Sequence, residues 1–251
     1  MSWRVPSNRP ARDTISTKDA TVSDKEHNLE FSTVLASSVH DMKNSLSMLL
    51  GTLDDISMQC GGRDCPSSPK FAQLQYEGQR VNNHLIQLLA IYKIENAMYS
   101  PHIAEHSLQD FLEESALQSE ALLAPKGIDI QFDCNADLIG FFDREMVAGV
   151  VNNVVNNAYR YSKDKIRLSA SQQQDYVVIS IEDNGRGYPP NMLCEHSDQL
   201  SGINFKSGST GLGLYFSYLV ARMHKNKGRH GYIVCANDGI DGGGKFSIFL
   251  P

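Results

Sequence analysis

Residues 35–56 read LASSVHDMKNSLSMLLGTLDDI, and apolar side chains recur in them alternately every four and every three residues. The repeat consists of Leu35, Val39, Met42, Leu46, Leu49, Leu53 and Ile56. A period of about 3.5 residues is typical of helices that wind around one another, because it keeps one apolar stripe facing the partner helix. We therefore predict a long helix here and call its apolar stripe the first seam.

A second helix of the same kind is predicted downstream. The glycines and prolines of GGRDCPSSP (61–69) interrupt the first pattern. The second seam then consists of Leu74, Gly78, Val81, Leu85, Leu88 and Tyr92. Two such helices with a short connection predict an antiparallel hairpin. One hairpin cannot bury both seams, so we expect two copies to form a homodimeric four-helix bundle; in the alternative, the hairpin packs on the rest of its own chain.

The pattern changes to mixed elements after Pro101, which ends the helical region. Helices are predicted over 107–124, 143–161 and 211–224, with Ser107 as the N-cap of the first. Alternating apolar residues predict strands over 127–134, 165–171, 177–183, 231–236 and 245–250. Residues 188–210 are rich in glycine, proline and polar residues and predict a long loop that acts as a lid.

Helices interspersed with hairpin-linked strands indicate an α/β sandwich with its helices on one face of a mixed sheet. The chain is therefore expected to be of the α+β class. We predict a mobile tail over 1–28, the helical hairpin over 29–100 and the α/β-sandwich domain over 101–251.

The composition narrows the classes of protein. Lys and Arg number 23 and Asp and Glu number 29, so the net charge of -6 leaves no broad basic surface and argues against a nucleic-acid partner. No apolar run approaches the roughly 18 residues that span a bilayer, and the N-terminus lacks the apolar stretch of a signal peptide, so we expect no direct membrane insertion. The 5 scattered cysteines suit reduced thiols. Together these features predict a cytoplasmic protein.

His40 leaves the first seam, because it is one residue past Val39 and about 100° further around the helix. Asp41 adjoins it, and Asn44 shares its face one turn later. A neutral imidazole is a usable nucleophile, and a neighbouring carboxylate can orient the ring and accept its second proton. An amide one turn away can position water against a phosphorylated ring. The alternative is an exposed histidine with no chemical role.

Four asparagines interrupt the otherwise apolar helix predicted over NNVVNNAYRYS (152–162). Asn153 and Asn157 lie four residues apart on one face of that helix. Amide oxygens suit Mg²⁺ and phosphate-bound water, and Arg160 and Tyr161 can meet phosphate. The alternative is helix capping or a polar surface.

Two glycine-rich turns complete the candidate site. Asp183 ends a predicted strand in EDNGRGYP (182–189), where Gly185 and Gly187 permit close approach of the backbone. Its carboxylate can accept a hydrogen bond from an exocyclic amine such as that of adenine; the alternative is a plain turn. The second turn, SGSTGLGL (207–214), precedes a helix and can present backbone amides to an anion, although it lacks the Walker sequence.

In this order, the four segments resemble the transmitter core of bacterial sensor histidine kinases over residues 31–251. HDMKNSL resembles the phosphoacceptor H box, NVVNNAYRYS the N box, DNGRG the first glycine box and STGLGL the second. The resemblance implies a dimerising helical hairpin followed by a GHKL-type ATP-binding sandwich, with ATP and Mg²⁺ as cofactors.

The resemblance also implies roles for individual residues. His40 is expected to be phosphorylated, Asp41 to activate its ring, and Asn44 to align water that dephosphorylates the partner. Asn157 is expected to bind Mg²⁺, supported by Asn153.

For the nucleotide, the resemblance implies that Asp183 recognises the adenine amine in a pocket that Gly185 and Gly187 shape. Phosphate contacts are expected from Arg160, Tyr161, Thr210, Gly211, Leu212 and Gly213. Phe205 is the candidate for the phenylalanine box of the lid, in the divergent setting GINFKSG.

The implied function is that of a cytoplasmic, sensor-less histidine kinase. It would phosphorylate His40 from Mg-ATP and pass the group to an aspartate of a response regulator receiver domain, with a separate sensory protein as a further partner. Asn153 stands where ATP-hydrolysing members of the wider superfamily carry a glutamate base, which favours transfer to His40 over hydrolysis. The alternatives are a regulator phosphatase or phosphotransfer protein with a regulatory ATP domain, and a non-catalytic adaptor that binds kinases or regulators.

Overall fold

The computed structural model describes residues 37–39, 41–56, 68–193 and 211–251. The chain divides into two compact units, Met1–Met42 and Lys43–Pro251. In the first unit, residues 37–39, 41 and 42 are helical; the remaining elements belong to the second unit. The predicted tail, His40 and most of the predicted lid, with Phe205 and Thr210, lie outside the described residues.

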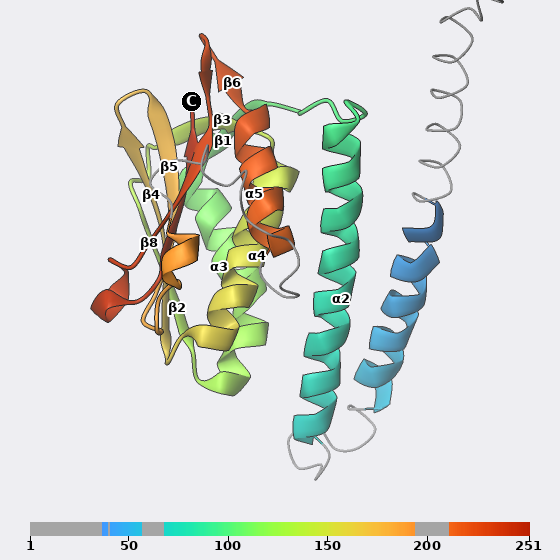
Figure 1. Cartoon of the computed structure of the whole chain (residues 1–251). Helices are drawn as coiled ribbons and strands as arrows, with labels where there is room; N and C mark the ends of the chain where they lie inside the picture. The colour runs from blue at the N-terminus through green and yellow to red at the C-terminus, as the bar shows by residue number, and fades with distance from the viewer. Residues whose placement is uncertain (1–36, 40, 57–67, 194–210) are drawn as a thin grey trace, which may run out of the picture. The chain divides into compact units, whose positions relative to one another are not determined.

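An antiparallel helical hairpin opens the second unit. Helix α2 covers Ser68–Glu95 and runs beside the helical residues 43–56 (Figure 1). A Cβ atom on Gly78 would lie 2.8 Å from Cδ2 of Leu50, and the side-chain amide of Gln75 donates to the carboxylate of Asp54. Because position 54 meets position 75 while position 50 meets position 78, the two helices run in opposite directions. The hairpin therefore forms as the heptad pattern predicts.

Among the described seam residues Val39 is buried, whereas those of the second unit remain at least partly exposed on this single chain. Leu49, Leu74 and Leu88 keep 51%, 53% and 42% of their surface accessible. Helix α2 does pack on its own chain, but it uses a different face, on which Ala90 and Ile91 are buried. The alternative, in which the hairpin packs on the rest of its own chain, therefore holds for this face of α2, and the pairing of the seams in a homodimer stays a prediction.

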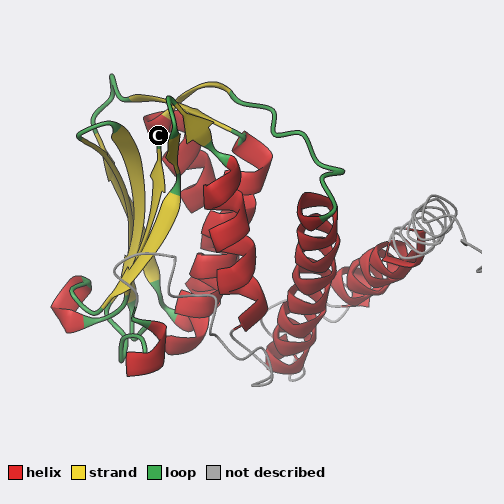
Figure 2. Cartoon of the chain, turned by 45° about the horizontal axis from the view of Figure 1, so that its top comes forward, coloured by secondary structure: helices red, strands yellow, loops and turns green. Residues whose placement is uncertain are grey.

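The rest of the unit is an α/β sandwich (Figures 1 and 2). Its sheet has the strand order β2-β4-β5-β9-β8. The strands are β2 (Asp129–Cys134), β4 (Lys165–Gln173), β5 (Tyr176–Asp183), β8 (Tyr232–Ala236) and β9 (Lys245–Leu250). Strands β2 and β4 are parallel and the other pairs are antiparallel, so the sheet is mixed, as predicted.

Three helices cover one face of this sheet (Figure 2). They are α3 (Leu108–Leu123), α4 (Arg144–Tyr161) and α5 (Gly211–Met223). Alternate residues of the central strands, such as Ile179 and Ile248, are fully buried against the valines of α4. This follows from the two-residue period of a strand, which directs every second side chain to the same face. The helices thereby hold the end of β5 close to the last turns of α4.

Short strands outside the main sheet are the elements that the sequence pattern missed. Strands β1 (Ala104–Ser107) and β3 (Ile139–Phe142) pair antiparallel, and β6 (Lys225–Asn226) pairs with β7 (Arg229–His230). Single turns of 3-10 helix cover Ala124–Lys126, Pro190–Met192 and Ile240–Gly242. Strands of two to four residues are too short to show a period.

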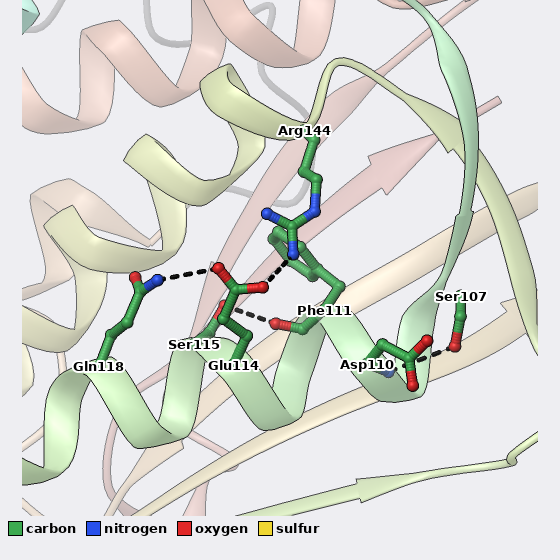
Figure 3. A network of polar contacts seen from close by, with 7 residues as sticks. All are labelled: Ser107, Asp110, Phe111, Glu114, Ser115, Gln118 and Arg144. Atoms are coloured by element: carbon green, nitrogen blue, oxygen red, sulfur yellow. Dashed lines mark hydrogen bonds and ion pairs between the residues drawn. The ribbon is translucent and has the colours of Figure 1, made fainter.

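The predicted start of α3 is confirmed (Figure 3). The backbone N–H of Asp110 donates to Oγ of Ser107 over 3.2 Å, which satisfies one of the free amides of the first turn. Further along α3, Glu114 forms an ion pair with Arg144, the first residue of α4. This pair links α3 to α4.

Candidate functional site

A cavity of about 120 Å³ lies where the end of β5 meets α4 and the start of α5. Asp183, the last residue of β5, forms part of its wall together with Asn157 and Tyr161 of α4. Leu214 of α5 and Met192 add apolar surface. The cavity is thus mostly apolar with one carboxylate, and we call it the Asp183 cavity. It unites residues of the predicted N box and the first glycine box.

Backbone atoms surround the carboxylate of Asp183 closely. The N–H of Gly185 donates to Oδ1 of Asp183 over 2.7 Å. A Cβ atom on Gly185 would lie 2.3 Å from the carbonyl oxygen of Tyr161, and one on Gly244 would lie 2.7 Å from Oδ2 of Asp183. Glycine is therefore required at both positions for steric reasons, because any larger residue would displace the carboxylate or the end of α4.

Burial raises the pKa of the Asp183 carboxyl above its ordinary value, although the N–H groups of Gly185 and Gly244 act in the opposite direction. A half-desolvated carboxylate that receives only two backbone N–H bonds retains acceptor capacity toward the cavity. The group is therefore suited to receive a hydrogen bond from a ligand amine.

Asn184 holds the turn that presents this carboxylate, and sequence reasoning did not single it out. Its Oδ1 accepts hydrogen bonds from the backbone N–H groups of Lys163, Asp164 and Lys165, over 3.2, 3.2 and 3.1 Å. Its amide nitrogen donates to Oδ1 of Asp164 over 2.7 Å. Asn184 is 5% exposed, so these bonds tie the end of β5 to the start of β4 from within the fold. In the sequence, Asn184 follows the end of an apolar strand and precedes a glycine, a pattern that is typical of an ordinary turn and does not indicate this role.

Gly187 and Asn237 close the other side of the turn. Gly187 has a φ of 74°, in the left-handed region, and a Cβ atom there would lie 2.5 Å from Oδ1 of Asn237. The same Oδ1 accepts the backbone N–H of Tyr188 over 2.6 Å, and the amide of Asn237 donates to the Tyr188 carbonyl over 2.9 Å. The predicted role of Gly187 in shaping the turn thus has a steric cause.

The second glycine box and the N box lie side by side. Helix α5 begins at Gly211, and a Cβ atom on Gly213 would lie 2.5 Å from both amide atoms of Asn153. Leu212 packs against the core, whereas Thr210 lies outside the described residues. The first turn of α5 therefore adjoins the asparagines of α4, and the amides of a helix N-terminus are suited to an anion.

A second cavity, of about 50 Å³, lies between α2 and α4, and we call it the α2–α4 cavity. From α4 it is lined by Asn153, Asn156, Asn157 and Arg160, so Asn157 faces both cavities. The side-chain amide of Gln87 on α2 donates to Oδ1 of Asn153 over 3.1 Å. Arg160 therefore lines a different cavity from its neighbour Tyr161, although the sequence suggested one phosphate-binding pair.

The predicted phosphoacceptor segment is only partly described. Asp41 and Asn44 are exposed residues of the helical stretch 41–56, and His40 lies outside the described residues. Within the described part of the chain, no cluster of three or more His, Cys, Asp or Glu residues has the arrangement of a metal site. A divalent cation would therefore have to be held by other ligands.

The residues present fit a nucleotide and its magnesium ion. The Asp183 cavity offers apolar walls and one carboxylate acceptor, which match a purine with an exocyclic amine. The buried Nδ2 of Asn153 has no hydrogen-bond partner among the described residues, as expected beside a site that takes polar ligands. Mg²⁺ in nucleotide sites takes few protein ligands and completes its shell with phosphates and water, so the amide oxygen of Asn157 would fit, joined by that of Asn153, which here accepts a hydrogen bond from Gln87.

Comparison with known proteins agrees with this geometry. Residues 142–251 match the family described as histidine kinase-, DNA gyrase B-, and HSP90-like ATPase. The sensor histidine kinase TmoS of Ectopseudomonas mendocina is 25% identical over 220 residues, which are 84% of this chain and 22% of TmoS. The alginate biosynthesis sensor protein KinB of Pseudomonas aeruginosa is 26% identical over 171 residues, 65% of this chain and 27% of KinB. The chain thus spans about a quarter of these curated relatives.

Solved structures show the same fold. The Acinetobacter baumannii histidine kinase AdeS aligns with a TM-score of 0.56 and 18% identity, covering 82% of this chain and 95% of that one. Full-length ShkA in complex with AMPPNP aligns with a TM-score of 0.60 and 18% identity, covering 87% of this chain and 45% of ShkA. None of the described helices combines the length and apolar character that crossing a bilayer requires. Residues 142–251 therefore match the histidine kinase-, DNA gyrase B-, and HSP90-like ATPase family, and the longer alignments are all with sensor histidine kinases.

Proposed function

We propose that the chain binds Mg-ATP, phosphorylates its own His40 and passes the phosphoryl group to an aspartate of a response regulator receiver domain. The observation that carries the proposal is the half-buried Asp183 carboxylate, which faces an apolar cavity beside Asn157. This is the arrangement that a purine with an exocyclic amine requires, since a desolvated acceptor rejects ligands that cannot donate to it.

In this proposal the adenine enters the Asp183 cavity and donates its amine to Asp183. Tyr161 and Met192 supply apolar surface against the ring. The phosphates then extend past Asn157, the residue that both cavities share, toward Asn153 and the first turn of α5. The amide oxygens of Asn157 and Asn153 would hold magnesium, which would supply positive charge against the phosphates.

An amide at position 153 favours transfer to a protein nucleophile over hydrolysis. Asn153 has no basic atom that could deprotonate water. A ring nitrogen of His40 attacks the γ-phosphorus, the bond from phosphorus to the β,γ-bridging oxygen breaks, and ADP leaves with the electron pair. Asp41 accepts the proton from the other ring nitrogen. The resulting phosphohistidine is the donor for the receiver aspartate.

Asn44 gives the same segment a second proposed activity. It is exposed and follows His40 by four residues in the sequence, where its amide can hold water against the acyl phosphate of a docked regulator. Asn44→Ala should slow the loss of phosphate from a regulator and leave labelling of His40 unchanged. Equal decay rates with both proteins would exclude this water-aligning role.

The test of the kinase proposal is incubation of the purified chain with γ-labelled ATP and Mg²⁺. We expect an acid-labile, base-stable label that His40→Gln abolishes. Asp183→Asn should also abolish it, through loss of nucleotide binding, whereas Asp133→Asn, an exposed carboxylate on β2, should not. A label that persists in His40→Gln would refute the assignment of the phosphoacceptor.

A further inference from the structure

Several buried polar atoms around the α2–α4 cavity have no hydrogen-bond partner, and the proposed function does not explain them. Among the described residues, the buried side-chain atoms without a hydrogen-bond partner include Oη of Tyr76, Nε of Arg80, Oε1 of Gln87 and Nδ2 of Asn153. All four residues line this cavity. Buried polar groups are almost always paired, so four unpaired atoms around one cavity indicate that something polar belongs there.

The charges of the cavity walls favour an anion. Arg80 enters from α2 and Arg160 from α4, so two guanidinium groups face the same space from opposite walls. The nearest acidic side chain on α2 is Glu77, which already forms an ion pair with Nη1 of Arg80 over 2.8 Å. His84 lines the same wall. Burial lowers the pKa of His84, and the positive charge of Arg80 lowers it further, so His84 contributes no charge near neutral pH. The wall is therefore cationic overall.

The donors of the cavity match a phosphate group. Three of the four unpaired atoms can donate, since Nε of Arg80 and Nδ2 of Asn153 are donors only and the hydroxyl of Tyr76 can donate as well, whereas Oε1 of Gln87 is an acceptor. Guanidinium groups are the side chains best suited to phosphate oxygens, because their donors form a planar fork. The volume of about 50 Å³ exceeds the roughly 10–15 Å³ that one water molecule needs, so a larger polar group can enter.

The position of the cavity identifies which phosphate. Asn157 lines both cavities, so a nucleotide whose base occupies the Asp183 cavity extends into the α2–α4 cavity with its distal end. Resting on the proposed nucleotide site, we propose that Arg80 of α2 binds the terminal phosphate of the nucleotide opposite Arg160. The hairpin then supplies part of the nucleotide site as well as the phosphoacceptor, and Arg80 discriminates a triphosphate from a diphosphate.

The test is calorimetric titration of the full chain with AMPPNP, ADP and adenosine in the presence of Mg²⁺. Arg80→Gln should weaken AMPPNP binding about ten- to a hundredfold, as expected for loss of a hydrogen bond between charged groups, and leave adenosine binding unchanged. Arg80→Lys should recover part of the loss because it restores the charge. Lys93→Gln removes an exposed cation from the last turn of the same helix and is the matched control.

The outcomes separate the two proposals. If Arg80→Gln binds all three ligands as Lys93→Gln does, the cavity holds only water and the inference is overturned. If Arg80→Gln weakens ADP and AMPPNP equally, Arg80 does not read the terminal phosphate, which also overturns it. If instead Asp183→Asn binds adenosine normally, the proposed nucleotide site itself fails. Thermal unfolding of each variant establishes that the fold is retained.

Discussion

The side-chain amide of Gln87 donates to Oδ1 of Asn153 across 66 residues of sequence, over a distance of 3.1 Å. Both residues are buried, at 5% and 9% exposure. The bond attaches α2 to the asparagine-bearing face of α4. The proposed magnesium ion would bind the same amide oxygen of Asn153. The hydrogen bond from α2 and the binding of magnesium therefore compete for one atom.

Replacing Gln87 by Leu should therefore strengthen binding of Mg-AMPPNP. A neutral hydrogen bond contributes about 0.5–1.5 kcal/mol, so we expect an affinity gain of roughly two- to tenfold. The same change should loosen α2, because Asn153 loses its partner, and amide exchange in the C-terminal half of α2 should become faster. Gln79→Leu, at an exposed position of α2, is the control in both measurements. An unchanged or weaker affinity would show that the two contacts do not compete.

Gly213→Ala should damage the site even though alanine favours helices. The new Cβ atom would lie 2.5 Å from the amide atoms of Asn153, so Asn153 must move. Overpacking of this kind costs about 1–3 kcal/mol, and displacement of Asn153 should reduce nucleotide affinity as well. Gly51→Ala is the matched control, because a Cβ atom there meets nothing within 4 Å and should stabilise its helix by about 0.5–1 kcal/mol. Chemical unfolding and nucleotide titration of both variants test the contrast.

Asn184→Ala should be one of the most destabilising changes in the sandwich. It removes the common acceptor of three backbone N–H groups and the donor to Asp164, all in a buried turn. We expect a loss of about 2–4 kcal/mol in the free energy of unfolding, because the abandoned groups stay desolvated. Asn184→Asp keeps the acceptor but places a second carboxylate against Asp164, so it should fall between Ala and the wild type at neutral pH. If Asn184→Ala lowers the free energy of unfolding by less than about 1 kcal/mol, Asn184 does not stabilise the turn as described.

His224 predicts a loss of stability in mild acid. Its Nε2 accepts the backbone N–H of Asp143 over 2.9 Å, and its Nδ1 lies 2.7 Å from the carbonyl of Val220, so the fold holds the neutral ring. Burial lowers the pKa of His224 in the folded state. The contribution of His224 to the free energy of unfolding is therefore fully present above the ordinary histidine pKa of about 6.5. It is lost as the pH falls below about 6.5 toward the pKa of His224 in the folded state.

The measurement is urea unfolding of the wild type and His224→Gln between pH 7.5 and pH 5. Glutamine can still accept the Asp143 N–H but does not titrate in this range. The stability of the wild type should fall more steeply toward pH 5 than that of the variant, with each unit of pKa depression equivalent to about 1.4 kcal/mol. Parallel curves would assign the acid sensitivity to other groups, among them His84, whose pKa burial also lowers.

The exposed seams predict a dimer that a charge can dissociate. In light scattering, Leu49→Asp combined with Leu88→Asp should convert the predicted dimer into a monomer, because burial of each leucine contributes roughly 1.5–3 kcal/mol. Met48 is even more exposed but lies off the seam, so Met48→Asp should remain dimeric. A monomeric wild type, or a monomeric Met48→Asp, would contradict a seam-to-seam bundle.

Local pattern carried the prediction of the elements and their order. The heptad repeat specified the hairpin because its period is a property of neighbouring residues, and alternation specified β4, β5 and β9 for the same reason. The cap at Ser107 followed from residues three positions apart. Strands β1 and β3 were not predicted, because a strand of four residues contains too few repeats to show a period.

The partnership of distant residues was beyond the reach of sequence pattern. Nothing in the spacing of Asn153 predicts that Gln87 meets it, or that Arg160 and Tyr161 face different cavities. Asn184 likewise reads as a turn residue until the start of β4 is placed against it. The period of the sequence pattern indicates which face of a helix or strand a side chain occupies. Its contact partner depends on how separate helices and strands pack. That packing depends on all of their buried surfaces together.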